Sequence, residues 1–154
     1  MIEHIEIGLA RTADAYAIAN MSREEIEAGL DWKWTPQSII RTIRDRETNV
    51  VVARKGDQIA GFAIMQYRET SAHLNLFAVA PTMRRRGIGS ALLQWLEATA
   101  RVAGIGIIRM EAREQNAAAR SFYKAHGYRE TAILPGYYQG EESAVRFEKD
   151  LTIE

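Results

Sequence analysis

The chain has 154 residues, of which 47% are hydrophobic and 26% are charged, and these proportions are typical of one soluble globular domain. Its 20 Lys and Arg balance its 20 Asp and Glu, so no net field draws it to a polyanion and we expect no nucleic-acid partner. The lack of cysteine excludes disulfides, thiolate metal sites and a cysteine nucleophile. No apolar run approaches the roughly 20 residues of a membrane helix, and the N-terminus does not resemble a signal peptide. We therefore expect a cytoplasmic protein with no membrane partner.

The first half of the chain predicts strands and helices that alternate in short segments. Apolar residues at every second position indicate strands, and the apolar stripe of Ile39, Ile40 and Ile43 indicates a helix. Thr12 is expected to cap the first helix, and Pro36 suits the first turn of the second. The expected elements in chain order are a strand over 4–9, helices over 12–21 and 35–45, and strands over 49–54, 59–67 and 72–79.

The second half predicts two further helices and three strands. Leu92, Leu93 and Leu96 lie on one side of the clearest helix, and Gly104 is expected to end it. The expected elements are helices over 90–103 and 116–126 and strands over 105–112, 128–134 and 144–151. The order β-α-α-β-β-β-α-β-α-β-β predicts an α/β (α+β) fold in a single domain, 1–154. It would contain a mixed, largely antiparallel, twisted sheet of about seven strands, with about four helices on both faces.

A basic run followed by glycines lies between a predicted strand and the clearest helix. Arg84, Arg85 and Arg86 precede Gly87-Ile88-Gly89-Ser90. Glycines let backbone N–H groups approach an anion, and the N-terminus of the helix adds the positive end of its dipole. The combination predicts a phosphate-binding site, and the alternative interpretation is a basic surface turn. A dinucleotide fold or a P-loop fits less well, because neither glycine pattern is present.

Two motifs in this half resemble those of the GNAT N-acetyltransferases. The first is Arg84-x-x-Gly87-x-Gly89, which matches the family's Gln/Arg-x-x-Gly-x-Gly/Ala after a strand. The second is Asn116-x-x-Ala119-x-x-x-Tyr123-x-x-x-Gly127-Tyr128, which departs from the family pattern in having Tyr for Phe at its end. Residues 110–113, Met-Glu-Ala-Arg, are similar to the family's Leu-Glu-Val-Arg, and Gly136-Tyr137-Tyr138 is similar to the Tyr-Tyr loop of ribosomal-protein alanine N-acetyltransferases. The resemblance covers residues 72–151 well, and the first half only in element order.

The resemblance implies acetyl-CoA as cosubstrate and no metal, with residues 1–70 on the acceptor side and 71–154 binding the cofactor. It implies that the strand before the basic run pairs with the pantetheine arm, which requires an unpaired strand edge at a splay or a bulge. The implied cofactor-binding residues are Phe77, Ala78, Val79, Arg84, Arg85, Arg86, Gly87, Ile88, Gly89, Ser90, Asn116, Ala119 and Tyr123.

Acetyl transfer to an amine requires removal of the ammonium proton and protonation of the leaving thiolate. Tyr123 is the candidate acid, and a packed core tyrosine is the alternative. Glu111 is the candidate base, because burial in its strand would raise the pKa of the carboxyl group; an ion pair with Arg109 or Arg113 is the alternative. His73 is either a half-buried structural histidine or a second base.

The resemblance implies that the acceptor is a primary amine, either a protein N-terminal α-amine or a small-molecule amine. The candidate substrate-binding residues are aromatic: Trp32, Trp34, Tyr137 and Tyr138. Each has a packing alternative, and a non-catalytic module that senses acetyl-CoA is the competing function. The protein is expected to be a monomer or a homodimer.

Overall fold

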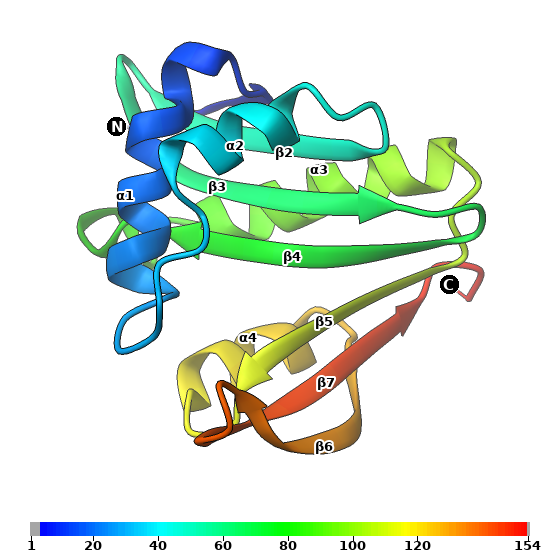
Figure 1. Ribbon diagram of the computed structural model, residues 1–154. Helices are drawn as coiled ribbons and strands as arrows, with labels where there is room; N and C mark the ends of the chain where they lie inside the picture. Colours follow the sequence, from blue (N-terminus) through cyan, green and yellow to red (C-terminus); the bar gives the residue numbers. More distant parts are fainter. Residues whose placement is uncertain (1–3, 154) are drawn as a thin grey trace.

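Seven strands form one open sheet in the computed structural model, which describes residues 4–153 (Figure 1). The spatial order of the strands is β1-β2-β3-β4-β5-β7-β6. All neighbouring strands are antiparallel except β4 and β5, which are parallel, so the sheet is mixed and largely antiparallel as predicted. The strands are β1 (Glu6–Leu9), β2 (Thr48–Lys55), β3 (Gln58–Tyr67), β4 (Ser71–Val79), β5 (Ile107–Arg113), β6 (Arg129–Tyr138) and β7 (Glu142–Asp150).

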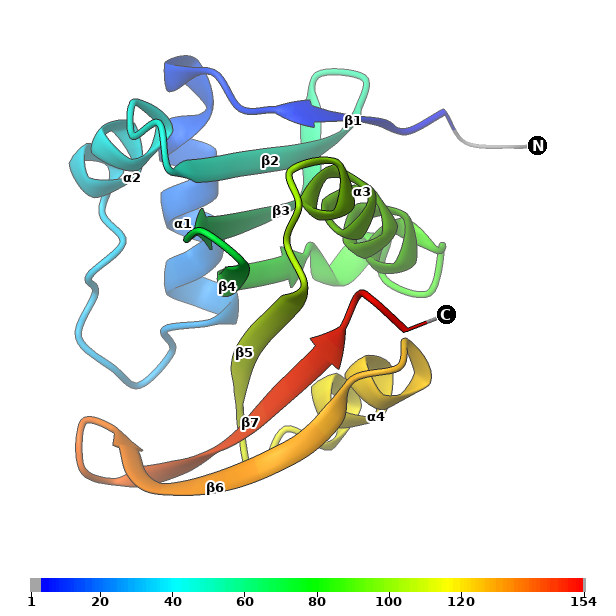
Figure 2. The ribbon, with the colours of Figure 1, turned by 90° about the vertical axis from the view of Figure 1, so that its right-hand side faces the viewer.

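Four α-helices cover both faces of this sheet, which confirms the predicted architecture. Figure 2 shows α1 and α2 on one face and α3 and α4 on the other. On the first face Ile18 and Ile39 pack with Phe62, and on the second Leu92 and Leu96 pack against the sheet. Burial of these apolar stripes against a sheet is what holds the layers together. The helices are α1 (Ala15–Glu25), α2 (Pro36–Ile43), α3 (Ile88–Val102) and α4 (Ala117–Ala125), and short 3₁₀ turns occupy Thr12–Asp14 and Pro81–Met83.

The start of the first helix differs from the prediction. Thr12 does not cap it but begins the 3₁₀ turn, and α1 follows Asp14. The Asp14 carboxylate accepts a hydrogen bond from the backbone N–H of Arg11 at 2.8 Å and pairs with Arg54 of β2. Asp14 therefore occupies the start of α1 because it forms a long-range ion pair, and not because its side chain caps the helix.

Two other boundaries affect the site. Helix α3 begins at Ile88, two residues earlier than predicted, so Gly87 is its N-cap. Strand β6 extends to Tyr138, so Tyr137 and Tyr138 lie at the end of a strand and not in a loop. By contrast, Pro36 lies in the first turn of α2 as predicted, and Thr35 is its N-cap, accepting a hydrogen bond from the N–H of Ser38 at 3.3 Å.

The sheet opens between β4 and β5. Their parallel pairing covers only three residue pairs, from Ser71↔Ile107 to His73↔Arg109. Beyond them β4 stays with β3 as far as Val79, whereas β5 turns away with β7, and Figure 1 shows the two strands diverging. The register of β4 against β3 also shifts at Asn75, a β-bulge that bends the strand at the point of divergence. The structure thus contains both the splay and the bulge that an unpaired strand edge requires.

The opened part of β4 depends on a close approach by β3, which we expect a single methyl group to disturb. A Cβ atom at Gly61 would lie 2.8 Å from the backbone oxygen of Ala78, and backbone yields little. We predict that Gly61→Ala lowers the free energy of unfolding by about 1–3 kcal/mol, the usual cost of overpacking. Gly8→Ala in β1 is the matched control, because no atom lies within 4 Å of its added Cβ. Equal unfolding free energies for the two variants in urea titrations would contradict this prediction.

Candidate active site

A cavity of about 700 Å³ lies between the free edge of β4, the segment 83–90 and helix α4, and we call it the β4–α4 cavity. Every cofactor-binding residue predicted from the sequence lines it except Arg86. Sequence reasoning missed four of its lining residues, Glu25, Met83, Ala118 and Phe122. Phe122 could have been predicted because it is next to Tyr123 in the sequence. Glu25 could not, because it comes from α1 and only the folded structure brings it to the cavity.

The N-terminus of α3 faces this cavity without a side-chain cap. Gly87 has φ of 78° and Arg85 has φ of 64°, two left-handed residues that turn the chain sharply ahead of the helix. Successive backbone N–H groups in such a turn, together with the helix dipole, form a concave anion-binding site. Gly89 lines the cavity as predicted, and its Cβ position also lies 3.3 Å from the Phe122 ring. Its small size lets α3 pack against α4.

These features fit acetyl-CoA by their chemistry. The uncapped helix end with Arg84 and Arg85 matches a pyrophosphate, and the edge of β4 beyond His73, which has no strand neighbour on this side, offers backbone groups to the amides of a pantetheine arm. When bound, this cosubstrate supplies an activated thioester.

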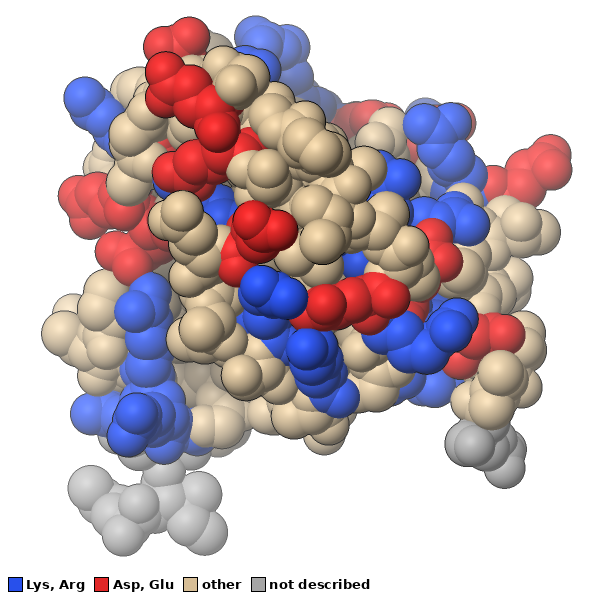
Figure 3. Space-filling view, turned by 90° about the horizontal axis from the view of Figure 1, so that it is seen from below, with Lys and Arg blue, Asp and Glu red and all other residues tan. Residues whose placement is uncertain are grey.

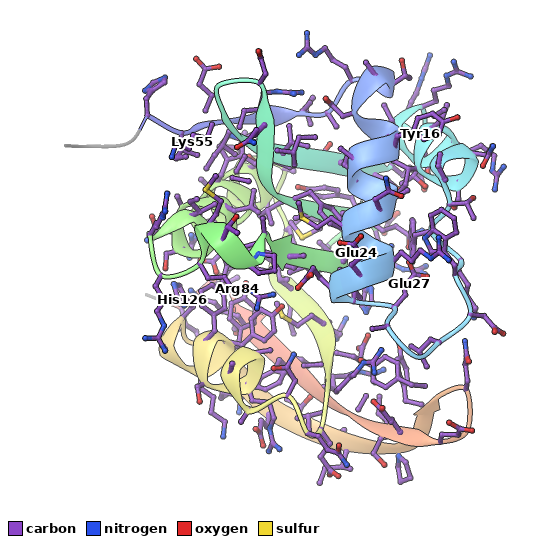
Figure 4. All side chains as sticks on the ribbon, turned by 90° about the vertical axis from the view of Figure 1, so that its left-hand side faces the viewer. Tyr16, Glu24, Glu27, Lys55, Arg84 and His126 are labelled. Atoms are coloured by element: carbon purple, nitrogen blue, oxygen red, sulfur yellow. The ribbon has the colours of Figure 1, made fainter. Side chains whose placement is uncertain are left out.

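Two of the three arginines make contacts that position the segment. Arg84 donates to the Val79 carbonyl at 3.3 Å and pairs with Glu25 at 2.7 Å, so it links the end of β4 to α1. Figure 4 shows Arg84 between the lower end of α1 and α4. Arg86 does not line the cavity, and its guanidinium contacts the Met83 sulfur at 3.6 Å.

Tyr123 lies in α4 among four aromatic rings and is only 7% exposed, yet it lines the β4–α4 cavity. Its hydroxyl has no hydrogen-bond partner among residues 4–153. Burial, with a smaller effect from the nearby Tyr138, raises the pKa of the phenol well above its ordinary value, so it remains protonated. Asn116 caps α4 as predicted, accepting from the N–H of Ala119 at 3.1 Å.

A second cavity of about 470 Å³ lies between β4, β5, the end of β6 and the loop that follows α1, and we call it the β4–β6 cavity. Leu76 of β4 lines this second cavity, and the next residue of the strand, Phe77, lines the first. Of the predicted substrate-binding residues, Trp34, Tyr137 and Tyr138 line the second cavity. The remaining lining residues are Ile26, Glu27, Leu30, Asp31, Lys33, His73, Asn75, Glu111 and Gln139.

Trp32 lines neither cavity. Its ring lies against the guanidinium of Arg23, 4.8 Å from the ring centroid, and packs on the core beneath α1 and α2. The predicted role as a lid over the acceptor is therefore replaced by the packing alternative, because a cation–π contact and apolar burial hold the ring away from the opening.

Glu111 does not have the environment predicted for it. Its carboxylate accepts from Tyr137 at 3.1 Å and Arg146 at 3.0 Å, and it contacts His73 at 2.7 Å. Burial alone would raise the pKa of the carboxyl group, but hydrogen bonds and charge from His73, Arg146 and Tyr137 lower it to about 2. Glu111 is thus ionised and weakly basic, which is the opposite of the predicted upward shift.

The partners proposed for Glu111 are also different. Arg109 pairs with Glu148 at 2.7 Å, and Arg113 pairs with Glu142 at 3.1 Å. The arginine that binds Glu111 comes instead from β7, because Arg146 lies directly opposite Glu111 in the antiparallel register. Arg146 could have been identified from the sequence, because it is a charged residue between two apolar residues, Val145 and Phe147, which are both buried.

Buried polar contacts fix the loop over the second cavity. Glu27 is 7% exposed and accepts from Ser22 at 2.7 Å and from the backbone N–H of Lys33 at 2.7 Å and of Trp34 at 3.2 Å. Arg113 donates to the carbonyls of Ile26 and Ala28, both at 2.8 Å, and so ties β5 to the same loop. Figure 4 shows Glu27 at the end of the helix where this loop begins. Sequence reasoning missed Glu27, whose partners lie five to seven residues away on both sides, in an arrangement that has no periodic pattern.

The described residues contain no candidate metal site and no candidate membrane-spanning helix that would indicate a different function. Among residues 4–153, no group of three His, Cys, Asp or Glu side chains could hold a metal ion, and no helix is long and apolar enough to cross a membrane. The face that Figure 3 shows carries acidic and basic side chains interspersed, without a continuous basic surface.

Comparisons with known proteins agree with this geometry. Residues 12–128 match the acetyltransferase (GNAT) family. A ribosomal protein bS18-alanine N-acetyltransferase of Salmonella typhimurium is 33% identical over 115 residues, which are 73% of this chain and 77% of the relative. An N-alpha-acetyltransferase, RimI, of Mycobacterium tuberculosis is 31% identical over 89% of this chain and 86% of its own.

The fold is also found among solved structures. Ard1 from Thermoplasma volcanium superposes with a TM-score of 0.85 at 26% identity, covering 95% of this chain and 97% of its own. Because a family model matches most of the chain and the geometry of the donor site agrees with it, the chain belongs to the GNAT family of acetyltransferases and is an acyltransferase that uses acetyl-CoA.

Proposed function

We propose that this enzyme transfers the acetyl group of acetyl-CoA to the α-amine at the N-terminus of a protein. The observation that carries the proposal is the β4–β6 cavity, which adjoins the thioester end of the β4–α4 cavity across consecutive residues of β4. An acceptor in one cavity and a donor in the other bring the nucleophile and the thioester together at the opening of the sheet. A relative named as a ribosomal protein bS18-alanine N-acetyltransferase and one named as an N-alpha-acetyltransferase support this acceptor class.

The aromatic end of β6 suits a peptide acceptor. The Tyr137 and Tyr138 rings lie 5.0 Å apart, and Arg113 lies over the Tyr138 ring at 5.5 Å. These side chains form a rigid wall opposite the loop that Glu27 and Arg113 hold in place. A peptide backbone entering between two such walls would present its terminal amine to the gap between β4 and β5.

Tyr123 is the proton donor in this proposal. It lines the donor side of the gap, it has no internal hydrogen-bond partner, and its raised pKa keeps it protonated until a thiolate forms beside it. The hydroxyl is not among the fully buried polar atoms without a partner in residues 4–153, so it reaches the cavity, where a thiolate could accept its proton.

The acceptor class is tested by a panel of amines incubated with acetyl-CoA and the enzyme and analysed by mass spectrometry. We expect acetylation at the α-amine of short peptides beginning with a small residue, and at most about one hundredth of that rate with the same peptides carrying a blocked N-terminus and a free lysine. Turnover of small amines but of no peptide would replace the acceptor class. Binding of acetyl-CoA without turnover of any amine would favour a sensing module.

For the proton donor, we predict that substitutions of two neighbouring tyrosines affect different properties: one lowers kcat, and the other lowers stability. Tyr123→Phe should lower kcat by about 10²-fold or more with little change in acetyl-CoA affinity, since the phenol acts mainly as the C–S bond breaks. Tyr128→Phe is the matched control, because its hydroxyl donates to the buried Glu97 at 2.9 Å and does not line the cavity. It should lose about 1 kcal/mol or more of stability and keep kcat. Wild-type kcat in Tyr123→Phe, with chemistry rate-limiting, would leave Tyr123 as a core residue.

A further inference from the structure

His126 connects the end of α4 to the start of α3. It is the C-cap of α4, and Figure 4 shows it where this end of the helix approaches the segment that begins α3. Its Nδ1 lies 2.8 Å from the backbone carbonyl oxygen of Phe122, and its Nε2 lies 2.9 Å from the hydroxyl oxygen of Ser90. Ser90 and Phe122 line the β4–α4 cavity, whereas His126 does not. One hydrogen-bonded side chain, Ser90, therefore separates the imidazole from the cavity.

These two contacts determine which nitrogen of the neutral imidazole carries the proton. A carbonyl oxygen only accepts hydrogen bonds, so Nδ1 carries the proton and donates it to Phe122. Nε2 of the neutral ring then has a lone pair and accepts a hydrogen bond from the Ser90 hydroxyl. Among residues 4–153 the Ser90 hydroxyl has no other partner. Its single proton thus points to His126, and only oxygen lone pairs are left for the cavity.

This arrangement is poorly matched to an anion in the cavity. Ser90 is the third residue of α3, at the helix end that suits the pyrophosphate of the acetyl donor. Oxygen lone pairs of the hydroxyl and of a phosphate repel each other. A ring that is protonated on both nitrogens removes this conflict, because Nε2–H donates to Ser90 and the hydroxyl proton is released to donate to a phosphate oxygen.

We propose that His126 is a positioning residue for the pyrophosphate of acetyl-CoA. When the cosubstrate binds, His126 takes up a proton from solvent, and this turns the proton of the Ser90 hydroxyl toward the phosphate. The inference rests on acetyl-CoA binding in the β4–α4 cavity and not on the identity of the acceptor amine, so it goes beyond the proposed function. His126 occupies an unspecified position of the second sequence motif, immediately before Gly127, and the motif therefore did not point to it.

The charges around His126 couple the proton uptake to the bound anion. The imidazole lies at the carbonyl end of α4, where the helix dipole favours a cation. It also faces the amino end of α3, whose dipole is unfavourable for a cation until an anion binds there. Three arginines precede the same helix end and act in the same direction: Arg84, Arg85 and Arg86. A bound pyrophosphate reverses the sign of the charge on this side of the imidazole.

The other charged and titratable groups on the elements around His126 are Glu97 of α3, Lys124 of α4, Tyr128, Glu130 of β6 and Lys149 of β7. They pair with one another. Lys149 donates to Glu97 at 2.9 Å and to the backbone carbonyl of His126 at 2.8 Å, and Lys124 pairs with Glu130 at 3.0 Å. Since these pairs are complete without a ligand, the pyrophosphate is the charge that binding adds.

Calorimetry with two fragments of the cosubstrate tests the proton uptake. Dephospho-CoA is the first, because it keeps the pyrophosphate but lacks the 3′-phosphate, a monoester whose own second ionisation lies at about pH 6. Its affinity should fall as pH rises from 5 to 8, where an imidazole loses its charge. Binding in buffers of different protonation enthalpy should show uptake of up to about one proton. Pantetheine, which has no phosphate, should show no uptake that depends on His126.

Two variants distinguish this role from a structural one. His126→Gln keeps a polar side chain but cannot gain a charge, and it should weaken dephospho-CoA binding near pH 6 by about tenfold or more, as expected for one charge-assisted hydrogen bond. Ser90→Ala should cause a loss of similar size. The two losses should not add in the double variant, because both remove the same hydrogen bond.

His4→Gln is the control, because His4 is exposed and contacts Glu6, and it should leave the affinity and the proton uptake unchanged. Proton uptake that persists unchanged in His126→Gln, or losses that add in the double variant, would overturn the inference.

NMR of the wild-type protein gives a second measurement that does not require His126→Gln to fold. The chain has three histidines, so the ring nitrogen signals of His126 can be assigned by substituting the other two. The neutral ring in the free enzyme should carry its proton on Nδ1. Saturating dephospho-CoA should increase the fraction of His126 that is protonated on both nitrogens, with His4 unchanged. A neutral ring protonated on Nε2, or an unchanged fraction in the complex, would overturn the inference.

Discussion

The short parallel pairing of β4 with β5 is the constraint on which the rest of the structure depends. After the third pair, His73↔Arg109, β4 no longer has a hydrogen-bonded neighbour on this side, while β5 continues with β7. Unpaired backbone groups inside a fold are costly unless something binds them. The free edge is therefore the place where a ligand with amides can complete the sheet, and both cavities adjoin it.

Charge contacts hold the two sides of the opening in position. On the donor side Arg84 links the end of β4 to Glu25 of α1, and on the acceptor side Arg113 links β5 to the carbonyls of Ile26 and Ala28. Glu111 joins β4, β5, β6 and β7 through its three contacts. The contacts of Glu111 with His73 and Arg146 are partly buried, so solvent screens them less than surface ion pairs, whereas the pair of Arg84 with Glu25 is exposed.

Local patterns predicted the donor side well and the acceptor side poorly. The basic run with Gly87 and the face of α4 that carries Tyr123 depend on neighbours in sequence, the family resemblance assigned both to one site, and both line one cavity. The pairing of Glu111 with Arg146 depends on contact between distant segments, which no local pattern encodes. Glu27 contacts residues five to seven positions away, and Trp32 contacts Arg23, but these contacts depend on the path of an irregular loop, which has no periodic pattern. The sign of the pKa shift of Glu111 was wrong for this reason: burial was predictable, but the three partners that outweigh it were not.

Hydrogen–deuterium exchange tests the central claim most directly, that the free edge of β4 binds the acetyl donor. If it does, saturating acetyl-CoA will slow exchange at the amides of residues 75–79 and at the N-terminus of α3, residues 88–90, by about tenfold or more. Exchange in β2, which pairs with both β1 and β3 and lines neither cavity, will stay unchanged. Unaltered exchange in residues 75–79, while calorimetry shows acetyl-CoA bound, would contradict the account.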